Sequence, residues 1–183
     1  MATIGVQVDP AEMRSFVAGL AGKRVLEVVN EPASGSLLHL GDWVRRHRPI
    51  PNDHLTEQLR NFRGSDSVFI QCPWVLDSPQ DLGLAVDMPD WRSRMQSRMD
   101  LLSALTGQTI SEAVYSLADM SLKLAFEPLG ATLTLEPLLE AGDLGEYSVQ
   151  VGDQYWIVQR DGRVFPTAAE ASEQEERDAP RPA

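Results

Sequence analysis

Apolar residues recur at helical spacing near the start of the chain, and their pattern predicts an amphipathic helix. The apolar positions on its buried face are Met13, Phe16, Val17 and Leu20. Asp9 is a suitable N-cap, and Pro10 suits the first helical position. Gly22 can adopt the left-handed conformation of a C-cap, so we expect the helix to end there.

After this helix the pattern changes to β-branched and alternating residues. Residues 25–29 predict a strand, residues 32–35 a turn, and residues 36–43 a second strand. An inserted loop over residues 44–64 interrupts the alternation, because its segment 45–54 is rich in Arg, His and Pro. The remaining elements expected in the first half are a short helix over 55–62 and a strand over 67–71.

The second half of the chain begins with a similar helical pattern. Asp90 is a candidate N-cap, and Gly107 stands where the helix is expected to end. The apolar face is formed by Trp91, Met95, Met99, Leu102 and Leu105. Strands are expected over residues 110–115, 121–126, 132–135, 147–151, 155–159 and 163–165. The second half is therefore rich in strands.

A faint repeat links the two halves. Residues 20–29 share Leu, Gly, Glu and Val with residues 105–114, at an offset of 85 positions. The register continues without a gap, since Ala33, Ser36 and Leu37 match Ala118, Ser121 and Leu122. Each half later reaches a Trp followed by two β-formers, at Trp74 and Trp156. The repeat predicts an α+β fold of two related halves, each a helix with antiparallel strands, that share one core.

The same patterns suggest boundaries along the chain. Residues 1–85 form the first half and residues 86–168 the second. Residues 169–183 are acidic and too poor in apolar residues to pack, so we expect this tail to be disordered.

Composition narrows the functional classes. The chain has 183 residues, is 43% hydrophobic and carries a net charge of −11. The excess charge is concentrated in residues 86–168, which contain 12 acids and 6 bases. Such a balance argues against nucleic acid as a partner and suits a basic protein. No stretch is apolar for long enough to cross a bilayer, which argues against a membrane partner.

Cysteine usage and the N-terminus bear on the compartment. Cys72 stands alone, which excludes an internal disulfide and suits a reducing compartment. The N-terminus lacks the basic start and apolar stretch of a signal peptide. We therefore expect a cytoplasmic protein, and the strong bias toward Arg over Lys is typical of a GC-rich bacterial genome.

Candidate chemistry gathers in the inserted loop. Arg45, Arg46 and Arg48 flank His47 and could bind a phosphate or an acidic segment of a partner. His39 and His54 complete the set of histidines, but their spacing matches no common metal site. Solvated loop residues are the simpler interpretation of this cluster.

Other candidate residues have ordinary structural explanations. Cys72 lacks a neighbouring base, so a buried thiol is favoured over a nucleophile. Glu27 and Glu112 are a matched pair in the repeat, and such carboxylates on strands more often face solvent than catalyse. Trp74 and Trp156 could stack a ligand, but core packing is the simpler interpretation.

The pattern Leu-x-Gly-x-x-[Val/Ile]-x-Glu-x-Val, followed by a Ser-Leu strand and a later Trp-[Val/Ile]-[Leu/Val], resembles uncharacterised small acidic bacterial proteins with antiparallel sheets. Some proteins of this type are immunity proteins, which neutralise secreted toxins. The resemblance implies a cytosolic binding protein and assigns no functional residues.

Two hypotheses follow from the sequence. The first is a non-enzymatic protein-binding module, similar to an immunity protein, that binds a basic toxin or effector. Its candidate binding residues are Arg45, Arg46, His47, Arg48, His54, Asp143, Glu146 and Asp153. It needs no catalytic residue, metal or cofactor, and a homodimer is left open. The alternative is a small-molecule or metal-dependent enzyme with its site in residues 38–54.

Overall fold

The computed structural model places ten strands in two antiparallel sheets, within the residues that it describes. Those residues are 9–31, 35–79, 100–138, 145–159 and 163–168. The strands are β1 (Val25–Glu31), β2 (Gly35–Arg45), β3 (Phe62–Ile70), β4 (Trp74–Asp77), β5 (Thr109–Tyr115), β6 (Leu122–Glu127), β7 (Ala131–Leu135), β8 (Gly145–Val151), β9 (Gln154–Gln159) and β10 (Val164–Ala168). The helices are α1 (Pro10–Ala18) and α2 (Glu57–Asn61), and residues 100–103 are also helical. The fold is therefore α+β and mostly β, which confirms the predicted class in its coarse form.

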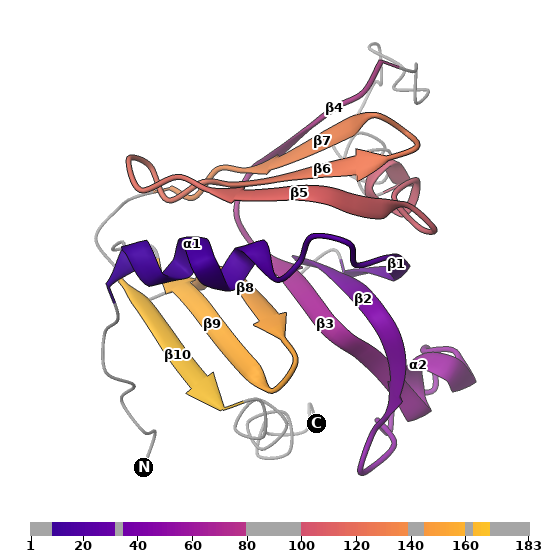
Figure 1. Cartoon of the computed structure of the whole chain (residues 1–183). Coiled ribbons are helices and arrows are strands. Elements are labelled where there is room, and N and C mark those ends of the chain that lie inside the picture. Colours follow the sequence, from indigo (N-terminus) through magenta and orange to yellow (C-terminus); the bar gives the residue numbers. More distant parts are fainter. Residues whose placement is uncertain (1–8, 32–34, 80–99, 139–144, 160–162, 169–183) are drawn as a thin grey trace.

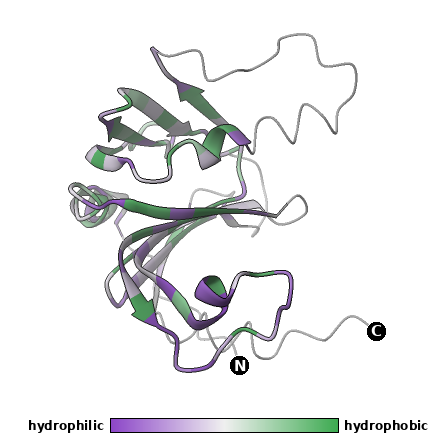
Figure 2. Ribbon diagram, turned by 90° about the vertical axis from the view of Figure 1, so that its right-hand side faces the viewer, coloured by the Kyte–Doolittle hydropathy of each residue, from purple (hydrophilic) through white to green (hydrophobic). Residues whose placement is uncertain are grey.

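One sheet has six strands in the order β1-β2-β3-β8-β9-β10, and the other has four in the order β4-β7-β6-β5. Figures 1 and 2 show the two sheets as separate layers with α1 between them. Met13, Val17 and Leu20 of this helix segment are fully buried, and the ring of Phe16 stacks on Trp156 with 4.7 Å between centroids. The buried apolar cluster includes residues of both sheets, so the core is shared.

The first helix begins as predicted and ends earlier. Asp9 caps it, because its carboxylate accepts a hydrogen bond of 2.8 Å from the backbone N–H of Ala11. The helix ends at Ala18, where Gly19 is the C-cap in a right-handed conformation. Gly22 does adopt a positive φ of +82°, but in the turn that follows the helix. The prediction that Gly22 caps the helix is therefore wrong.

The inserted segment is shorter than predicted on the side of β3. Helix α2 starts after Thr56, whose hydroxyl accepts a hydrogen bond from the N–H of Leu59. It ends at Asn61, and β3 begins immediately at Phe62, five positions before the predicted strand. Residues 62–66 are extended because they pair with the far end of β2, where Val44 lies opposite Arg63. In Figure 1 this long β2–β3 hairpin and α2 project away from the two-sheet body.

The two repeated segments pair with each other at the junction of the sheets. The N–H of Gly22 donates to the carbonyl of Ile110 at 2.7 Å, and the N–H of Gly107 donates to the carbonyl of Val25 at 2.8 Å. The N–H of Val25 donates to the carbonyl of Gln108, and that of Ile110 to the carbonyl of Lys23, both at 2.8 Å. Residues at the 85-position offset thus exchange equivalent hydrogen bonds. The φ of Gly107, +86°, also matches that of Gly22.

The strands after these segments share a bulge but differ in length. The register shifts between Val25 and Glu27 in the first sheet and between Ile110 and Glu112 in the second, at the same offset. Val25 lies opposite Leu40, whereas Ile110 lies opposite Phe126. Since an offset of 85 would give residue 125, the second hairpin is one residue longer. The gapless match of Ser36 and Leu37 to Ser121 and Leu122 therefore does not hold in space.

The two sheets contain equivalent sets of four strands, β1-β2-β3-β8 and β5-β6-β7-β4, which we call the two units. The last strand of each unit comes from the opposite half of the sequence. Strand β4 follows β3 in the chain but pairs with β7, where Trp74 lies opposite Leu135. Strand β8 follows β7 but pairs with β3, where Ile70 lies opposite Tyr147. Trp74 and Tyr147 therefore occupy equivalent positions, and Trp156 lies on the additional strand β9. The two units are intertwined.

Two predicted boundaries lie outside the described residues. The division at residue 85 falls within residues 80–99, and the acidic tail covers residues 169–183. Both stay predictions. In the described part of the chain, no helix is long and apolar enough to span a membrane.

Candidate functional site

The outward side of the four-stranded sheet carries small, β-branched and acidic residues. Alternation buries Leu122, Leu124 and Phe126 of β6 against the core and turns the residues between them outward. We call this outward side the acidic face. It consists of Val75, Asp77, Glu112, Val114, Lys123, Ala125, Glu127, Thr132 and Thr134. Three carboxylates against one ammonium give it a negative charge.

Cross-strand pairing arranges the acidic face in rows. One row runs from Val75 through Thr134 and Lys123 to Val114. Both valines are unusually exposed, at 43% and 45%, on the two edge strands.

The neighbouring row places acids at both ends. It runs from Asp77 through Thr132 and Ala125 to Glu112. The side chains in the middle are short, so the face has apolar and acidic groups at its margins. Such a surface offers a protein partner both apolar contact and charge.

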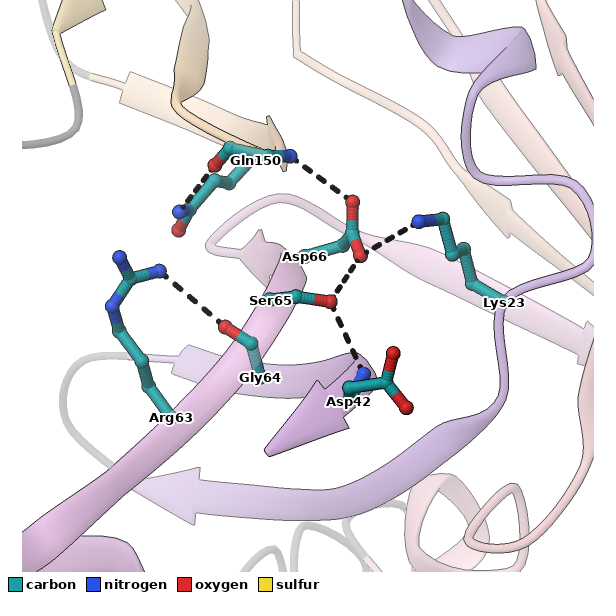
Figure 3. Close-up of polar contacts among 8 residues, drawn as sticks. Lys23, Asp42, Arg63, Gly64, Ser65, Asp66 and Gln150 are labelled. Atoms are coloured by element: carbon teal, nitrogen blue, oxygen red, sulfur yellow. Dashed lines mark hydrogen bonds and ion pairs between the residues drawn. The ribbon is translucent and has the colours of Figure 1, made fainter. Parts of the chain in front are cut away.

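The six-stranded sheet contains a buried carboxylate, that of Asp66 on β3 (Figure 3). Asp66 is 1% exposed and lies 3.0 Å from the ammonium of Lys23. The hydroxyl of Ser65 donates to it at 2.6 Å, and the backbone N–H of Gly152 donates at 3.1 Å. Asp66 thereby joins three segments: the turn before β1, strand β3 and the β8–β9 turn. Its partners satisfy both oxygens, so its role is structural.

The three histidines are not brought together. His39 is buried on β2, where its Nδ1 accepts a hydrogen bond of 3.2 Å from the N–H of Gly64. Burial, and then the positive charges of Arg46 and Arg63, lower the pKa of His39 to about 4. The imidazole is therefore neutral at physiological pH. His47 and His54 are exposed in the segment between β2 and β3.

The arginines of the inserted segment divide into two kinds. The Nε of Arg46 donates to the backbone carbonyls of Leu59 and Phe62, both at 3.2 Å. It therefore ties the segment to the start of β3. Arg45 and Arg48 are exposed. Of this cluster, these two arginines and the exposed histidines are the groups available to a partner.

The acidic candidates of the second half lie in unlike places. Glu146 is 1% exposed and accepts a hydrogen bond of 3.1 Å from the N–H of Leu138, so it cannot form a surface contact. Asp153 is exposed in the β8–β9 turn of the six-stranded sheet, whereas the acidic face belongs to the four-stranded sheet. Asp143 lies outside the described residues.

Cys72 is buried near the carboxylate of Glu146. Burial, and then the negative charge of Glu146, raise the pKa of its thiol to about 12. The thiol is therefore protonated at neutral pH and poorly nucleophilic. The burial of Cys72 agrees with the sequence-based prediction of a buried thiol.

The matched carboxylates Glu27 and Glu112 follow equivalent bulges but lie on different sheets. Burial raises the pKa of Glu27, which lies opposite His39 in the register, while Glu112 is exposed on the acidic face. Within the described ranges, no group of three or more His, Cys, Asp or Glu residues is placed to hold a metal ion. The alternative of an enzyme site in residues 38–54 stays a prediction, with no further observation in its favour.

Sequence reasoning missed the acidic face and Asp66. The face was hidden because its members are spread over four strands that are joined in space and separated in sequence. The burial of Asp66 could have been predicted from the sequence, because Asp66 lies two and four positions before Val68 and Ile70 and therefore shares their inward side of β3. Comparison with protein-family models, with curated proteins and with solved structures gives no match for this chain.

Proposed function

We propose that this chain is a non-enzymatic protein-binding module that docks a basic partner on the acidic face. The observation that carries the proposal is that two exposed valines and three exposed carboxylates lie on the same side of the four-stranded sheet. Val75 and Val114 provide apolar contact, and Asp77, Glu112 and Glu127 provide charge complementarity. Lys123 in the middle adds a donor that fixes orientation.

The charge of the whole chain favours the same partner. A net charge of −11 attracts basic proteins over distances of about one Debye length, roughly 8 Å at physiological salt. The acidic face lies mostly on the second half, which carries the larger acidic excess. A basic toxin or effector, neutralised in the cytoplasm by an immunity protein, is the partner class that we propose.

We also infer that the two halves descend from one duplicated helix-and-strand unit. The reciprocal hydrogen bonds of Gly22 and Gly107 support this, as do the equivalent bulges at Glu27 and Glu112. The exchanged strands β4 and β8 support it further, because each completes the sheet of the other half.

The proposed function is tested by reversing the charge of the acidic face. Affinity capture from the native host identifies a partner, and titration with the purified partner then measures Kd. In the variant Asp77→Lys/Glu112→Lys/Glu127→Lys we expect Kd to rise by about 100-fold, because three attractions become repulsions. Asp153, a candidate binding residue from the sequence, is exposed in the β8–β9 turn of the six-stranded sheet and is not part of the acidic face. Asp153→Lys is therefore the control, and we expect it to change Kd little.

Salt dependence gives the second readout of the same binding. Wild-type affinity is expected to fall by at least about tenfold when ionic strength rises from roughly 0.05 to 0.5 M. A partner whose Kd is unchanged both by the triple reversal and by salt would rule out the acidic face as its docking site.

A further inference from the structure

The acidic face has short side chains in its middle and carboxylates at its two margins. The central strands, β6 and β7, contribute Ala125, Thr132 and Thr134, whose side chains are half-buried. The margins are the outer strands of the sheet. Asp77 on β4 and Glu112 on β5 lie at opposite ends of one cross-strand row, and both are exposed. A partner segment can therefore approach the middle of the sheet closely and meet a carboxylate on either side.

The width of the face suits an α-helix. The strand order β4-β7-β6-β5 places three strand spacings between the margins. At about 4.8 Å for each spacing, the margins are roughly 14 Å apart. A helix with its side chains is about 10–12 Å wide, so it fits between them when it lies along β6 and β7. Lys or Arg side chains on its flanks are long enough to reach Asp77 on one side and Glu112 on the other.

The inner side of the same sheet already packs against a helix. Helix α1 lies between the two sheets and contacts β5 (Figure 1), and its Met13 and Val17 are fully buried. On the outward side, Val75 and Val114 remain 43% and 45% exposed at the two margins. A second helix on this side would cover apolar surface that the described part of the chain leaves exposed.

The charges on β6 favour one direction for such a helix. Lys123 and Glu127 both project outward and are exposed. They are four strand residues apart, roughly 13 Å, which is the length of about nine helical residues. A helix carries partial positive charge at its N-terminus and partial negative charge at its C-terminus. The N-terminus is therefore favoured at Glu127 and the C-terminus at Lys123. Arg24 shares the row of Glu127 but lies two strands away, beyond Thr109.

From this geometry we propose that the acidic face binds an amphipathic helix of the basic partner, which runs antiparallel to β6. Small apolar residues of that helix face β6 and β7, and Lys or Arg residues lie along both of its flanks. This inference rests on the proposed function, because it requires the acidic face to be the docking site. It adds the secondary structure, the residue pattern and the direction of the bound segment.

The first test compares two synthetic peptides, each added to the full chain. Both have about 20 residues, a length at which an Ala-rich helix is stable in isolation. They carry Ala and Leu on one face and Arg along both flanks, and they have the same composition and charge. The control peptide contains two central D-Ala residues, which disrupt a right-handed helix. We expect the all-L peptide to bind with a Kd at least about tenfold lower, measured from amide NMR shifts of the acidic face.

The second test measures the direction of the bound helix. A nitroxide label at the peptide N-terminus should broaden the amide signal of Glu127 more than that of Lys123, and a label at the C-terminus should do the reverse. The variant Lys123→Glu/Glu127→Lys exchanges the two charges and keeps the net charge of the face. We expect it to change the ratio of the two broadenings by at least about threefold in favour of the opposite direction, because both helix ends then meet a like charge.

The outcomes separate this inference from the proposed function. Equal Kd values for the two peptides, no binding by either, or equal broadening of both signals by each label would overturn the bound helix or its direction. The response of the native partner to the triple charge reversal would still decide the docking site. A peptide that binds the triple-reversal variant as tightly as the wild type would instead contradict the acidic face as the site, and with it both proposals.

Discussion

At the position where β3 carries Asp66, β7 carries Ala131. Both residues lie opposite the last inward residue of the preceding strand, Leu40 in one sheet and Phe126 in the other. A buried carboxylate that pairs with the partly exposed Lys23 in one unit thus corresponds to a buried apolar side chain in its counterpart. The shared hydrogen-bond frame tolerates either, because the backbone ladder does not depend on the side chain.

A second pair of equivalent positions shows the same contrast on the outward sides. His39 lies opposite Glu27 and Ser67, and the corresponding Ala125 lies opposite Glu112 and Thr132. His39 is buried, whereas Ala125 lies in the partly exposed middle of the acidic face. The six-stranded sheet therefore uses its outward side for internal contacts, whereas the four-stranded sheet leaves its outward side partly exposed, and this is the side on which we propose that a partner docks.

The largest expected effect comes from removing matched core leucines. Leu38 of β2 and Leu124 of β6 are equivalent inward residues, and both are fully buried. Leu38→Ala and Leu124→Ala should each lower the free energy of unfolding by about 2–5 kcal/mol, through lost burial and the cavity left behind. Denaturant unfolding, followed by circular dichroism and Trp fluorescence, measures both losses.

The shape of these transitions tests whether the two sheets share one core. Because the apolar cluster spans both sheets, each variant should show one cooperative transition by both probes. Val114→Ala, on the exposed side of the sheet, is the control and should change stability little. Separate transitions for the two sheets would show that they fold independently.

The next largest effect is a pH dependence of stability, which distinguishes the outward side of the six-stranded sheet from that of the four-stranded sheet. The pKa of His39 is lowered to about 4, below the value of about 6.5 for an ordinary histidine. As pH falls below 6.5, the unfolded chain takes up this proton first, so stability that is present above pH 6.5 is lost toward pH 4. The difference between the two pKa values corresponds to about 3 kcal/mol.

The variant His39→Gln isolates this contribution, since a Gln oxygen can still accept from the N–H of Gly64. Unfolding free energies at pH 7 and pH 4 should differ by about 3 kcal/mol less in the variant than in the wild type. The exposed His47→Gln serves as control and should retain the wild-type difference. An unchanged pH dependence in His39→Gln would show that the imidazole is solvated.

Local signals were sufficient to predict much of this fold. The start of α1 follows from the cap at Asp9, and most strands follow from alternation within a single segment. Residues 62–66 were missed because Arg63, Gly64 and Ser65 do not alternate. They become a strand through pairing with β2, which is a long-range contact. The exchange of β4 and β8 was inaccessible for the same reason.

The candidate site was harder to predict, because alternation reveals a side of a strand and not its exposure. Glu146, Ser148 and Gln150 alternate with apolar residues in β8, which favours an outward and solvated side. All three are buried instead. The hydroxyl of Tyr155 donates to Ser148 at 2.6 Å, and the N–H of Leu138 donates to Glu146. Neighbouring segments therefore satisfy polar groups that the sequence pattern assigns to solvent.

The smallest effect concerns the glycines at which the two units meet. Gly22 and Gly107 have φ values of +82° and +86°, and a Cβ at either position would meet no atom closer than 3.8 Å. Substitution by Ala therefore costs only the strain of a left-handed backbone, about 1 kcal/mol at each position. Asn tolerates this conformation better, so Gly22→Asn and Gly107→Asn should cost less than the Ala variants. Equal losses at the two positions, measured by thermal unfolding, would show that the paired turns are energetically as well as geometrically equivalent. A loss of stability at one position alone would mean that the two turns are equivalent in geometry but not in energy.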